Sequence, residues 1–318
     1  MKALIFGAGS VGCVYGYILH NAGVDLAVVC RSNLAAARNS GISIDSELYG
    51  QVHYHPKTTG SVSEAASLHG PFDYILICCK ALPGVCEQIQ EAVGERTAIV
   101  LAQNGIDIER EYAQRYPDNA IISGVVWLAA TQLSPGVIKA GKAEKFETGT
   151  YPASAPRSHK RQAGQLSALW SRGSPGGGAP VYEDIQPQRW LKLTVNATWN
   201  PIAALTRCDG GTLFLMAEQA SATDILVRTM HQVGAVAAST GCAGLVTDAH
   251  VKRVMQFYHS QRATPESGKE SSMLMDVNAG RPLEVEAILG NLLRIARETR
   301  STFQILSFSC LELYKCKG

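Results

Sequence analysis

The stretch Met1-Lys-Ala-Leu-Ile-Phe-Gly7-Ala-Gly9-Ser-Val-Gly12 decides the fold of the first half of the chain. Residues Lys2 to Phe6 form an apolar run that predicts a short buried strand. After the glycines, a helix-like run continues to a stop at Asn21-Ala-Gly23, and Val24 to Cys30 predicts a second strand. A strand, G-x-G-x-x-G, a helix and a second strand within about thirty residues form the dinucleotide-binding βαβ unit.

The glycines of this turn have a direct physical purpose. They allow a tight turn and a close approach of the backbone to a pyrophosphate, whose charge is met by amides at the helix N-terminus. We therefore predict a cofactor-binding loop made of Gly7, Gly9, Ser10, Val11 and Gly12.

The end of the second predicted strand bears on the choice of cofactor. An acidic residue there would bind the ribose 2′-hydroxyl of NAD, whereas an arginine suits the 2′-phosphate of NADP. The strand ends in Cys30-Arg31-Ser32, without Asp or Glu. Arg31 offers a planar fork of donors, so the sequence favours NADP(H). The alternative is a surface arginine that binds no ligand.

Three further runs predict buried parallel strands. Phe72 to Cys79 is followed by Lys80, Thr97 to Ala102 by Gln103-Asn104-Gly105, and Ala120 to Ala130 is the third. Strands that alternate with helical segments indicate a doubly wound sheet, which binds ligands beyond the carboxyl ends of its strands. Lys80 and Asn104 lie at such ends, although Asn-Gly also favours a turn for purely local reasons.

The rest of the first half is less regular. Ile42 to Lys57 predicts short strands or a hairpin, and Gly136 to Thr150 an edge hairpin. Residues 151–180 predict a connector with one helix around Lys160 to Trp170 and a glycine-rich end near Gly176. After Val181 the periodicity is helical. We expect an α/β Rossmann domain over residues 1–180 and an all-α domain over residues 181–318.

One helical stretch of the second half, Gln188 to Ile202, carries a narrow polar stripe. Lys192, Asn196 and Asn200 recur every four residues, so a single helix would align them on one side among apolar neighbours. Such a stripe predicts a cleft, and the alternative is a surface stripe with a solvated lysine.

A second polar motif follows later in the chain. Glu270-Ser-Ser272-Met-Leu-Met-Asp276 leads into a helix, and Gly280-Arg-Pro282-Leu-Glu284 marks a helix end and a new start. Glu284 would lie near the positive end of the new helix, where a carboxylate is also expected merely to complement the helix dipole.

Composition limits the classes of partner. The 318 residues are 46% hydrophobic and 18% charged with a net charge of +2, which fits a globular protein and gives no sign of nucleic-acid binding. No apolar segment is long enough to cross a membrane. Nine cysteines without paired spacing predict neither a metal site nor disulfides, and indicate a cytoplasmic location.

Together these motifs resemble one family, the ketopantoate reductases (2-dehydropantoate 2-reductases), from residue 1 to about residue 300. The resemblance rests on the glycine loop, Gln103-Asn104-Gly105, Trp190 to Asn196 with Asn200-Pro201, and Ser271-Ser272-Met273 with Asp276 and Glu284. It implies a Rossmann domain followed by a helical domain, with the active site in the cleft between them. It leaves open a homodimer formed through the helical domain.

The resemblance also implies roles for single residues. Lys192 resembles the catalytic proton donor, and Glu284 its acidic partner and a cofactor contact. Asn104 resembles a residue that meets both cofactor and substrate. The implied substrate ligands are Asn196, Asn200 and Ser272, and the further cofactor contacts are Arg31 and Lys80.

The implied reaction is the NADPH-dependent reduction of 2-dehydropantoate to (R)-pantoate, a step towards coenzyme A. An ammonium group near the ketone oxygen stabilises and protonates the negative charge that hydride transfer creates there. Two alternatives remain open: a reductase of another branched or aromatic 2-oxo acid, and a non-catalytic NADP(H)-sensing protein.

Overall fold

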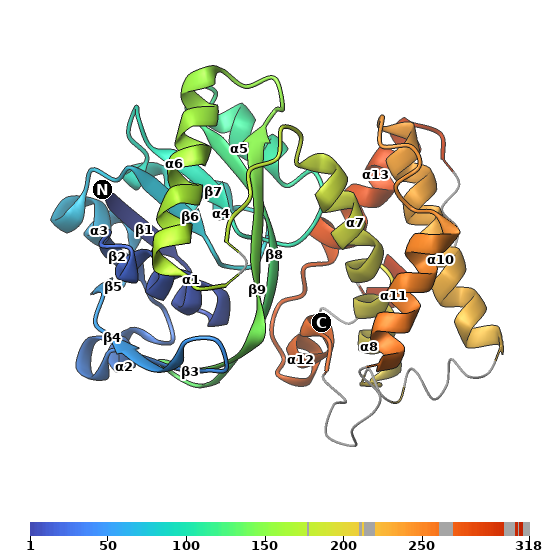
Figure 1. The fold of residues 1–318 in the computed structure, drawn as a ribbon, viewed down its shortest axis with the longest axis horizontal. Helices are drawn as coiled ribbons and strands as arrows, with labels where there is room; N and C mark the ends of the chain where they lie inside the picture. The colour runs from blue at the N-terminus through green and yellow to red at the C-terminus, as the bar shows by residue number, and fades with distance from the viewer. Residues whose placement is uncertain are drawn as a thin grey trace. The chain divides into compact units, whose positions relative to one another are not determined.

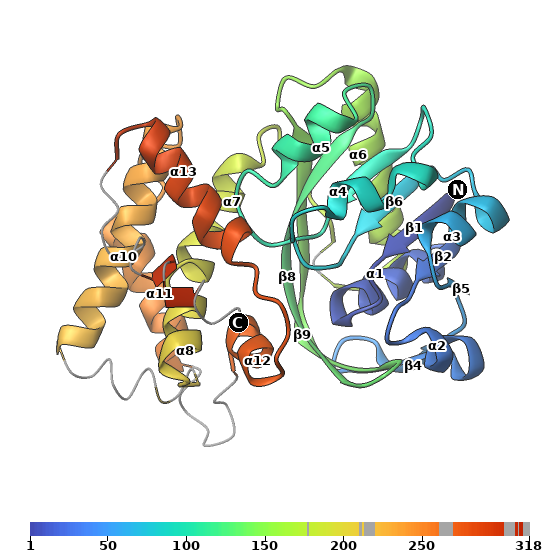
Figure 2. The ribbon, with the colours of Figure 1, turned by 180° about the vertical axis from the view of Figure 1, so that it is seen from behind.

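The computed structural model describes residues 1–176, 178–209, 212, 220–260, 270–301, 309–310 and 312–313. Gly177 of the predicted connector and most of the tail after Thr302 lie outside these ranges. The chain divides into two units, which Figures 1 and 2 show as ribbons. The first unit comprises Met1–Gln103 and Glu109–Ile185, and the second comprises Asn104–Ile108 and Gln186–Gly318.

The first unit is built on one nine-stranded sheet with the order β4-β3-β9-β8-β7-β6-β1-β2-β5. The strands from β8 to β5 in this order are parallel, whereas β8 pairs with β9, and β3 with β4, in antiparallel fashion. The strands are β1 Lys2–Phe6, β2 Asp25–Val29, β3 Ile42–Ser46, β4 Gly50–Tyr54, β5 Lys57–Thr59, β6 Tyr74–Ile77, β7 Ala98–Leu101, β8 Ile121–Ser134 and β9 Val137–Tyr151.

Helices cover both faces of this sheet, so the predicted doubly wound architecture is confirmed. Figure 1 shows α1 and α6 over one face, and Figure 2, seen from behind, shows α3, α4 and α5 over the other. The helices are α1 Ser10–Asn21, α2 Leu34–Ser40, α3 Val62–His69, α4 Val85–Gln88, the 3₁₀ turn η1 Gln90–Ala92, α5 Glu109–Arg115 and α6 Arg157–Gly173.

The strand order reverses at β1, and this positions the glycine loop. From β1 the chain adds β2 and β5 on one side of the sheet, then returns to add β6, β7 and β8 on the other. In open α/β sheets, ligands bind at this topological switch point, beyond the carboxyl ends of the strands. The loop that starts at Gly7 follows β1 directly, and Cys79 follows the neighbouring strand β6.

The prediction that the Gly136–Thr150 hairpin forms the edge of the sheet was wrong. β8 and β9 do form an antiparallel hairpin, but residues 137–140 of β9 also pair in parallel with residues 43–46 of β3. The β3–β4 hairpin therefore lies outside β9, and β4 is the edge strand. This second pairing satisfies backbone groups of β9 that an edge position would leave to water.

Helix α6 belongs to the core of the first unit. Trp170 is fully buried, and its ring centroid lies 4.6 Å from that of Tyr15 on α1. At the end of α6, the Gly173 carbonyl accepts a hydrogen bond from Asn21 Nδ2 at 2.9 Å. A Cβ atom on Gly173 would lie 1.9 Å from the backbone oxygen of Ile18, so α1 and α6 approach each other as closely as their backbones allow.

The second unit is helical, as predicted. Its core is formed by buried apolar side chains that include Trp190, Leu193, Val233, Leu289 and Leu292. The elements are α7 Gln186–Asn196, α8 Trp199–Thr206, α10 Ala220–Ser239, α11 Asp248–Ser260, α12 Ser272–Asn278, the π-helical turn η3 Glu286–Gly290 and α13 Asn291–Glu298.

The prediction of one continuous helix from Gln188 to Ile202 was wrong. α7 ends at Asn196, and α8 begins at Trp199. The amide of Ala197 still bonds to the carbonyl of Leu193 at 2.8 Å, but the amide of Thr198 bonds to Val195 at 3.3 Å, which tightens the last turn. Lys192 and Asn196 therefore share one helix, and Asn200 lies on the next.

The start of the helix after Gly280 was also predicted too early. Pro282 lies before the helix, which begins at Val285 and continues as η3. Glu284 immediately precedes the helix, and its carbonyl accepts the amide of Ile288 at 3.1 Å. Its position at the N-terminal end of the helix is as predicted.

Two glycines of α6 provide a matched test of the α1–α6 contact. Gly173→Ala should lower the free energy of unfolding by about 1–3 kcal/mol, because the added methyl group meets the backbone of α1. Gly164→Ala should raise it by about 0.5–1 kcal/mol, because Gly164 is exposed and an added Cβ meets no atom within 4 Å. Urea titration of both variants measures the difference, and equal effects would contradict the packing described.

Candidate functional site

The three glycines of the loop after β1 differ in what surrounds them. Gly7 has φ 106°, and a Cβ atom there would lie 2.6 Å from the backbone nitrogen of Cys79. A Cβ atom on Gly12 would lie 2.0 Å from the carbonyl oxygen of Gly7. At Gly9, by contrast, an added Cβ meets no atom within 4 Å. Gly7 and Gly12 are thus required by the protein's own packing, whereas Gly9 leaves open space beside the backbone.

The N-terminus of α1 has the features of an anion site. Gly9 is the N-cap residue and offers no side chain, and the first turn contains no acidic residue. The orphan amides of a helix N-terminus attract negative charge, and no carboxylate of this turn opposes it. Ser10 and Val11 are partly exposed at this end of the helix.

Cys13 and Cys30 are two of the thiols near this loop, and both are neutral at physiological pH. Cys13 Sγ lies 3.5 Å from the carbonyl oxygen of Ala8. Burial raises the pKa of Cys13 to about 12 and that of Cys30 to about 11. Cys13 and Cys30 therefore add no negative charge that would repel an anion.

Sequence reasoning missed one buried amide that supports the loop. Asn33 is 3% exposed, and its Nδ2 donates to the carbonyl of Ala8 and, at 3.0 Å, to Gln132 Oε1. Gln132 Nε2 donates in return to Asn33 Oδ1 at 3.0 Å. This pair joins the glycine loop, the end of β2 and strand β8. Gln132 is 99 residues away in the chain, so no local pattern could have indicated the contact.

The remaining predicted cofactor contacts also lie in the first unit. Arg31 is exposed, two residues after β2, and its carbonyl accepts the amide of Leu34 at the start of α2. Lys80 follows β6 by three residues and is partly exposed. Both are thus beyond the carboxyl ends of parallel strands that flank the switch point.

The predicted substrate ligands lie in the second unit and meet in pairs. Asn196 Nδ2 donates to Asn104 Oδ1 at 3.1 Å, although the two residues are 92 positions apart. Asn200 Nδ2 lies 3.4 Å from Ser272 Oγ, and Ser271 caps α12 by accepting the amide of Leu274. Asn196 and Asn200 are buried, at 5% and 7% exposure.

Lys192 and Glu284 lie in the same unit as these amides. Lys192 is on α7, four residues before Asn196, so the two side chains lie on one face of that helix. Glu284 stands between the buried Leu283 and Val285. Both Lys192 and Glu284 are half-buried and polar, as groups that meet a polar ligand need to be.

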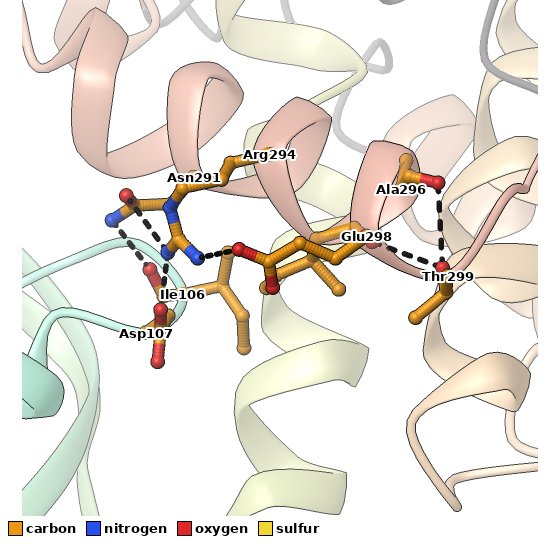
Figure 3. Close-up of polar contacts among 8 residues, drawn as sticks. Ile106, Asp107, Asn291, Arg294, Ala296, Glu298 and Thr299 are labelled. Carbon is orange, nitrogen blue, oxygen red and sulfur yellow. Dashed lines mark hydrogen bonds and ion pairs between the residues drawn. The ribbon is translucent and has the colours of Figure 1, made fainter.

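The segment that carries Asn104 is bound by residues from distant parts of the helical unit. Arg189 Nη1 donates to the carbonyl of Gly105 at 3.0 Å, and the amide of Ile106 bonds to the carbonyl of Ala287 at 3.0 Å. Figure 3 shows Asn291 and Arg294 of α13 contacting Ile106 and Asp107. Sequence reasoning missed these contacts, which join residues 84 to 187 positions apart.

Comparison with known proteins assigns the family. Residues 3–153 match the family described as ketopantoate reductase PanE/ApbA, and residues 184–307 match its C-terminal part. The 2-dehydropantoate 2-reductase of Mesorhizobium japonicum is 28% identical, over 93% of this chain and 92% of the relative. A crystal structure of 2-dehydropantoate 2-reductase from Methylococcus capsulatus is 30% identical with a TM-score of 0.83, over 99% of this chain and 96% of that one.

The chain therefore belongs to the ketopantoate reductase family of oxidoreductases. A ternary structure of D-mandelate dehydrogenase with NADH and anilino(oxo)acetate has the same fold, with a TM-score of 0.84 at 20% identity over 100% of this chain and 98% of that one. In the described part of this chain, no helix is both long and apolar enough to span a bilayer.

The Asn33–Gln132 pair predicts a coupled loss of stability. Asn33→Ala should lower the free energy of unfolding by about 1–3 kcal/mol, because it removes the donor to the buried carbonyl of Ala8. The loss of stability in the double variant Asn33→Ala/Gln132→Ala should be smaller than the sum of the two single-variant losses. We expect the difference to be about 0.5 kcal/mol or more. Denaturant unfolding of the four proteins measures this coupling, and strictly additive losses would contradict the pairing.

Proposed function

We propose that the protein is an NADPH-dependent reductase that converts 2-dehydropantoate to (R)-pantoate in the cytoplasm. The observation that carries the proposal is the hydrogen bond between Asn104 and Asn196, with Lys192 one turn earlier on α7. Family membership supports the reaction class. In this proposal residues 1–180 bind the cofactor, and residues 181–318 supply the catalytic groups.

The glycine loop fits the pyrophosphate of a dinucleotide. Gly9 leaves space where a Cβ would otherwise stand, and the adjoining N-terminus of α1 has neither a capping side chain nor an acidic residue. Gly7, Ser10, Val11 and Gly12 complete this loop. The cofactor supplies the hydride, and the protein supplies orientation and charge.

Arg31 and Lys80 are the proposed cationic contacts of the cofactor. Arg31 is exposed beyond β2, at the strand end where the ribose is recognised in this class of fold. Its guanidinium can form two parallel hydrogen bonds to a 2′-phosphate. The preference for NADP(H) rests on this residue and on the absence of an acidic residue at Cys30-Arg31-Ser32.

Lys192 is the proposed proton donor. Its ammonium group hydrogen-bonds to the ketone oxygen of the substrate and stabilises the negative charge that develops there as C2 is reduced. The proton then passes from Nζ to that oxygen and forms the hydroxyl group, and the neutral amine takes up a proton from water. General acid catalysis of this kind contributes about 10²–10⁴-fold to the rate.

The remaining polar groups bind and orient the acid. Asn104, Asn196, Asn200 and Ser272 offer amide and hydroxyl donors to the carboxylate and the terminal hydroxyl of ketopantoate. Glu284 is the proposed acidic partner of Lys192 and a contact of the cofactor. Because Asn196 and Asn200 are buried, a substrate group that fails to bond them would leave a buried polar group unpaired, which favours polar substrates.

A second candidate is the reduction of another branched or aromatic 2-oxo acid. D-mandelate dehydrogenase shares the fold, so this architecture also serves a dehydrogenase of an aromatic hydroxy acid. A third candidate, an NADP(H)-sensing protein, would need the glycine loop but no half-buried lysine beside substrate amides. The presence of Lys192 and Glu284 therefore favours an enzyme.

Replacement of Lys192 tests the proposed function. The purified protein should oxidise NADPH when ketopantoate is added, and Lys192→Ala should lose about 10²–10⁴-fold in kcat while its Kd for NADPH is unchanged. Lys252→Ala is the control, because Lys252 is an exposed lysine of α11 in the same unit. The decrease in NADPH absorbance measures kcat, and fluorescence titration measures the Kd for NADPH.

The outcomes separate the candidates. Normal turnover by Lys192→Ala would refute the assigned role. Higher kcat/KM for an aromatic or a different branched 2-oxo acid than for ketopantoate would favour the second candidate. Binding of NADPH without turnover of any 2-oxo acid would favour the sensor.

Replacement of Arg31 tests the cofactor preference. Arg31→Ala should weaken NADPH binding about 10- to 100-fold and leave NADH binding nearly unchanged, because only NADPH carries the 2′-phosphate. Arg38→Ala is the control: Arg38 lies on the adjacent helix α2 but pairs with Glu64 at 2.8 Å. Equal losses for NADPH and NADH in Arg31→Ala, measured by isothermal titration calorimetry, would show that Arg31 does not bind the phosphate.

A further inference from the structure

A series of hydrogen bonds from the helices of the second unit fixes residues 104–108. The side chain of Asn104 accepts from Asn196, the carbonyl of Gly105 from Arg189, and the carbonyl of Ile106 from Asn291 at 2.9 Å. The amide of Ile106 donates to Ala287. Each residue from 104 to 106 is thus held by a hydrogen bond, and together these bonds leave the segment little freedom.

Asp107 adds an ion pair to this set. Its carboxylate pairs with Arg294 Nη2, and the side chains are 10% and 34% exposed, respectively. Arg294 also donates to Asn291 Oδ1 at 3.4 Å and to Glu298 at 3.0 Å. The pairing of Arg294 with both carboxylates raises its pKa despite partial burial, so the guanidinium stays charged. Figure 3 shows the carboxylates of Asp107 and Glu298 both in contact with the guanidinium of Arg294.

The backbone of the segment needs this support. Gly105 has φ 114° and Asp107 has φ 57°, so two of three successive residues are in the left-handed region. Asp is among the few non-glycine residues that tolerate this region, yet it is not the relaxed state of the chain. Such conformations persist where surrounding contacts determine them, and they cluster near functional sites.

We propose that Asp107 and Arg294 form a positioning pair for the substrate amide of Asn104. The ion pair holds residues 105–107 in their left-handed turn, and the turn holds Asn104 Oδ1 against Asn196 Nδ2. The Nδ2 hydrogens of Asn104 then point towards the substrate, since the oxygen is already engaged. Neither Asp107 nor Arg294 needs to touch the substrate itself. This inference rests on the proposed function only in assigning Asn104 to substrate binding.

The variant Asp107→Asn tests the pair with the least disturbance. Asn has the same shape as Asp and tolerates positive φ equally, so the change removes the charge and little else. We expect the KM for the 2-oxo acid to rise about three- to tenfold with a smaller change in kcat, because a lost charge-assisted bond of this kind weakens positioning rather than the proton donor. The Kd for NADPH should be unchanged.

Glu298→Gln is the matched control. It also removes a carboxylate from Arg294, but Glu298 bonds only to α13 among the contacts described here and not to residues 104–108. Its KM should equal that of the wild type. Arg294→Ala should raise the KM, and Arg294→Lys, which retains the charge, should raise it less. Equal KM values for Asp107→Asn and Glu298→Gln would overturn the proposal.

Amide hydrogen exchange provides a readout that does not depend on activity. In Asp107→Asn the amide of Ile106, which bonds to Ala287, should exchange about tenfold faster, while amides of α10 keep their wild-type rates. In Glu298→Gln the Ile106 amide should remain protected. Unchanged exchange in Asp107→Asn would overturn the proposal. Failure of the wild type to reduce any 2-oxo acid would instead refute the proposed function, and the exchange comparison would still decide whether the pair holds the segment.

Discussion

The second unit depends on the burial of a five-residue segment from the first half of the chain. The chain enters this unit at Asn104, leaves it after Ile108 and returns at Gln186. Ile106 is 1% exposed and belongs to the same apolar core as Trp190 and Val285. A buried segment must have partners for its backbone polar groups. Arg189, Ala287 and Asn291 provide them: Arg189 is only 2% exposed, and Ala287 lies in the π-helical turn η3.

This insertion has a consequence for the chemistry. Asn104 follows strand β7 of the nine-stranded sheet in the chain, but its side chain is bonded to α7 of the helical unit. The proposed substrate amides and the proposed proton donor thus share one structural framework, the second unit. Enzymes gain most from groups held in place before the reaction, because fixed dipoles and charges need no reorganisation as charge develops. The close packing at Gly105, where a Cβ would lie 2.5 Å from the Ala287 carbonyl, serves the same end.

Local patterns in the sequence were sufficient for the glycine loop, the parallel strands, the helical second half and the family. They were sufficient because the tight turn at Gly7 and the apolar strands that follow are encoded by adjacent residues. The predictions failed where distant pairing decides the structure. The β8–β9 hairpin was placed at the edge because nothing in residues 136–150 indicates pairing with β3. The Asp107–Arg294 pair spans 187 positions. The interruption at Ala197-Thr198 is an exception, because Pro201 has no amide to bond to the carbonyl of Ala197 and so marks the break locally. The roles of Lys192, Glu284 and the amides stay predictions.

The central claim is that Lys192 acts on a ligand held by amides of the unit to which it belongs. A crystal structure of the protein with NADP⁺ and a 2-hydroxy acid product tests it most directly. The account predicts that Lys192 Nζ lies within hydrogen-bond distance of the product hydroxyl oxygen, and that Asn104 Nδ2 and Asn196 bond to the same ligand. A bound product whose hydroxyl group contacts neither Lys192 nor Asn104, with the lysine directed into bulk solvent, would contradict it.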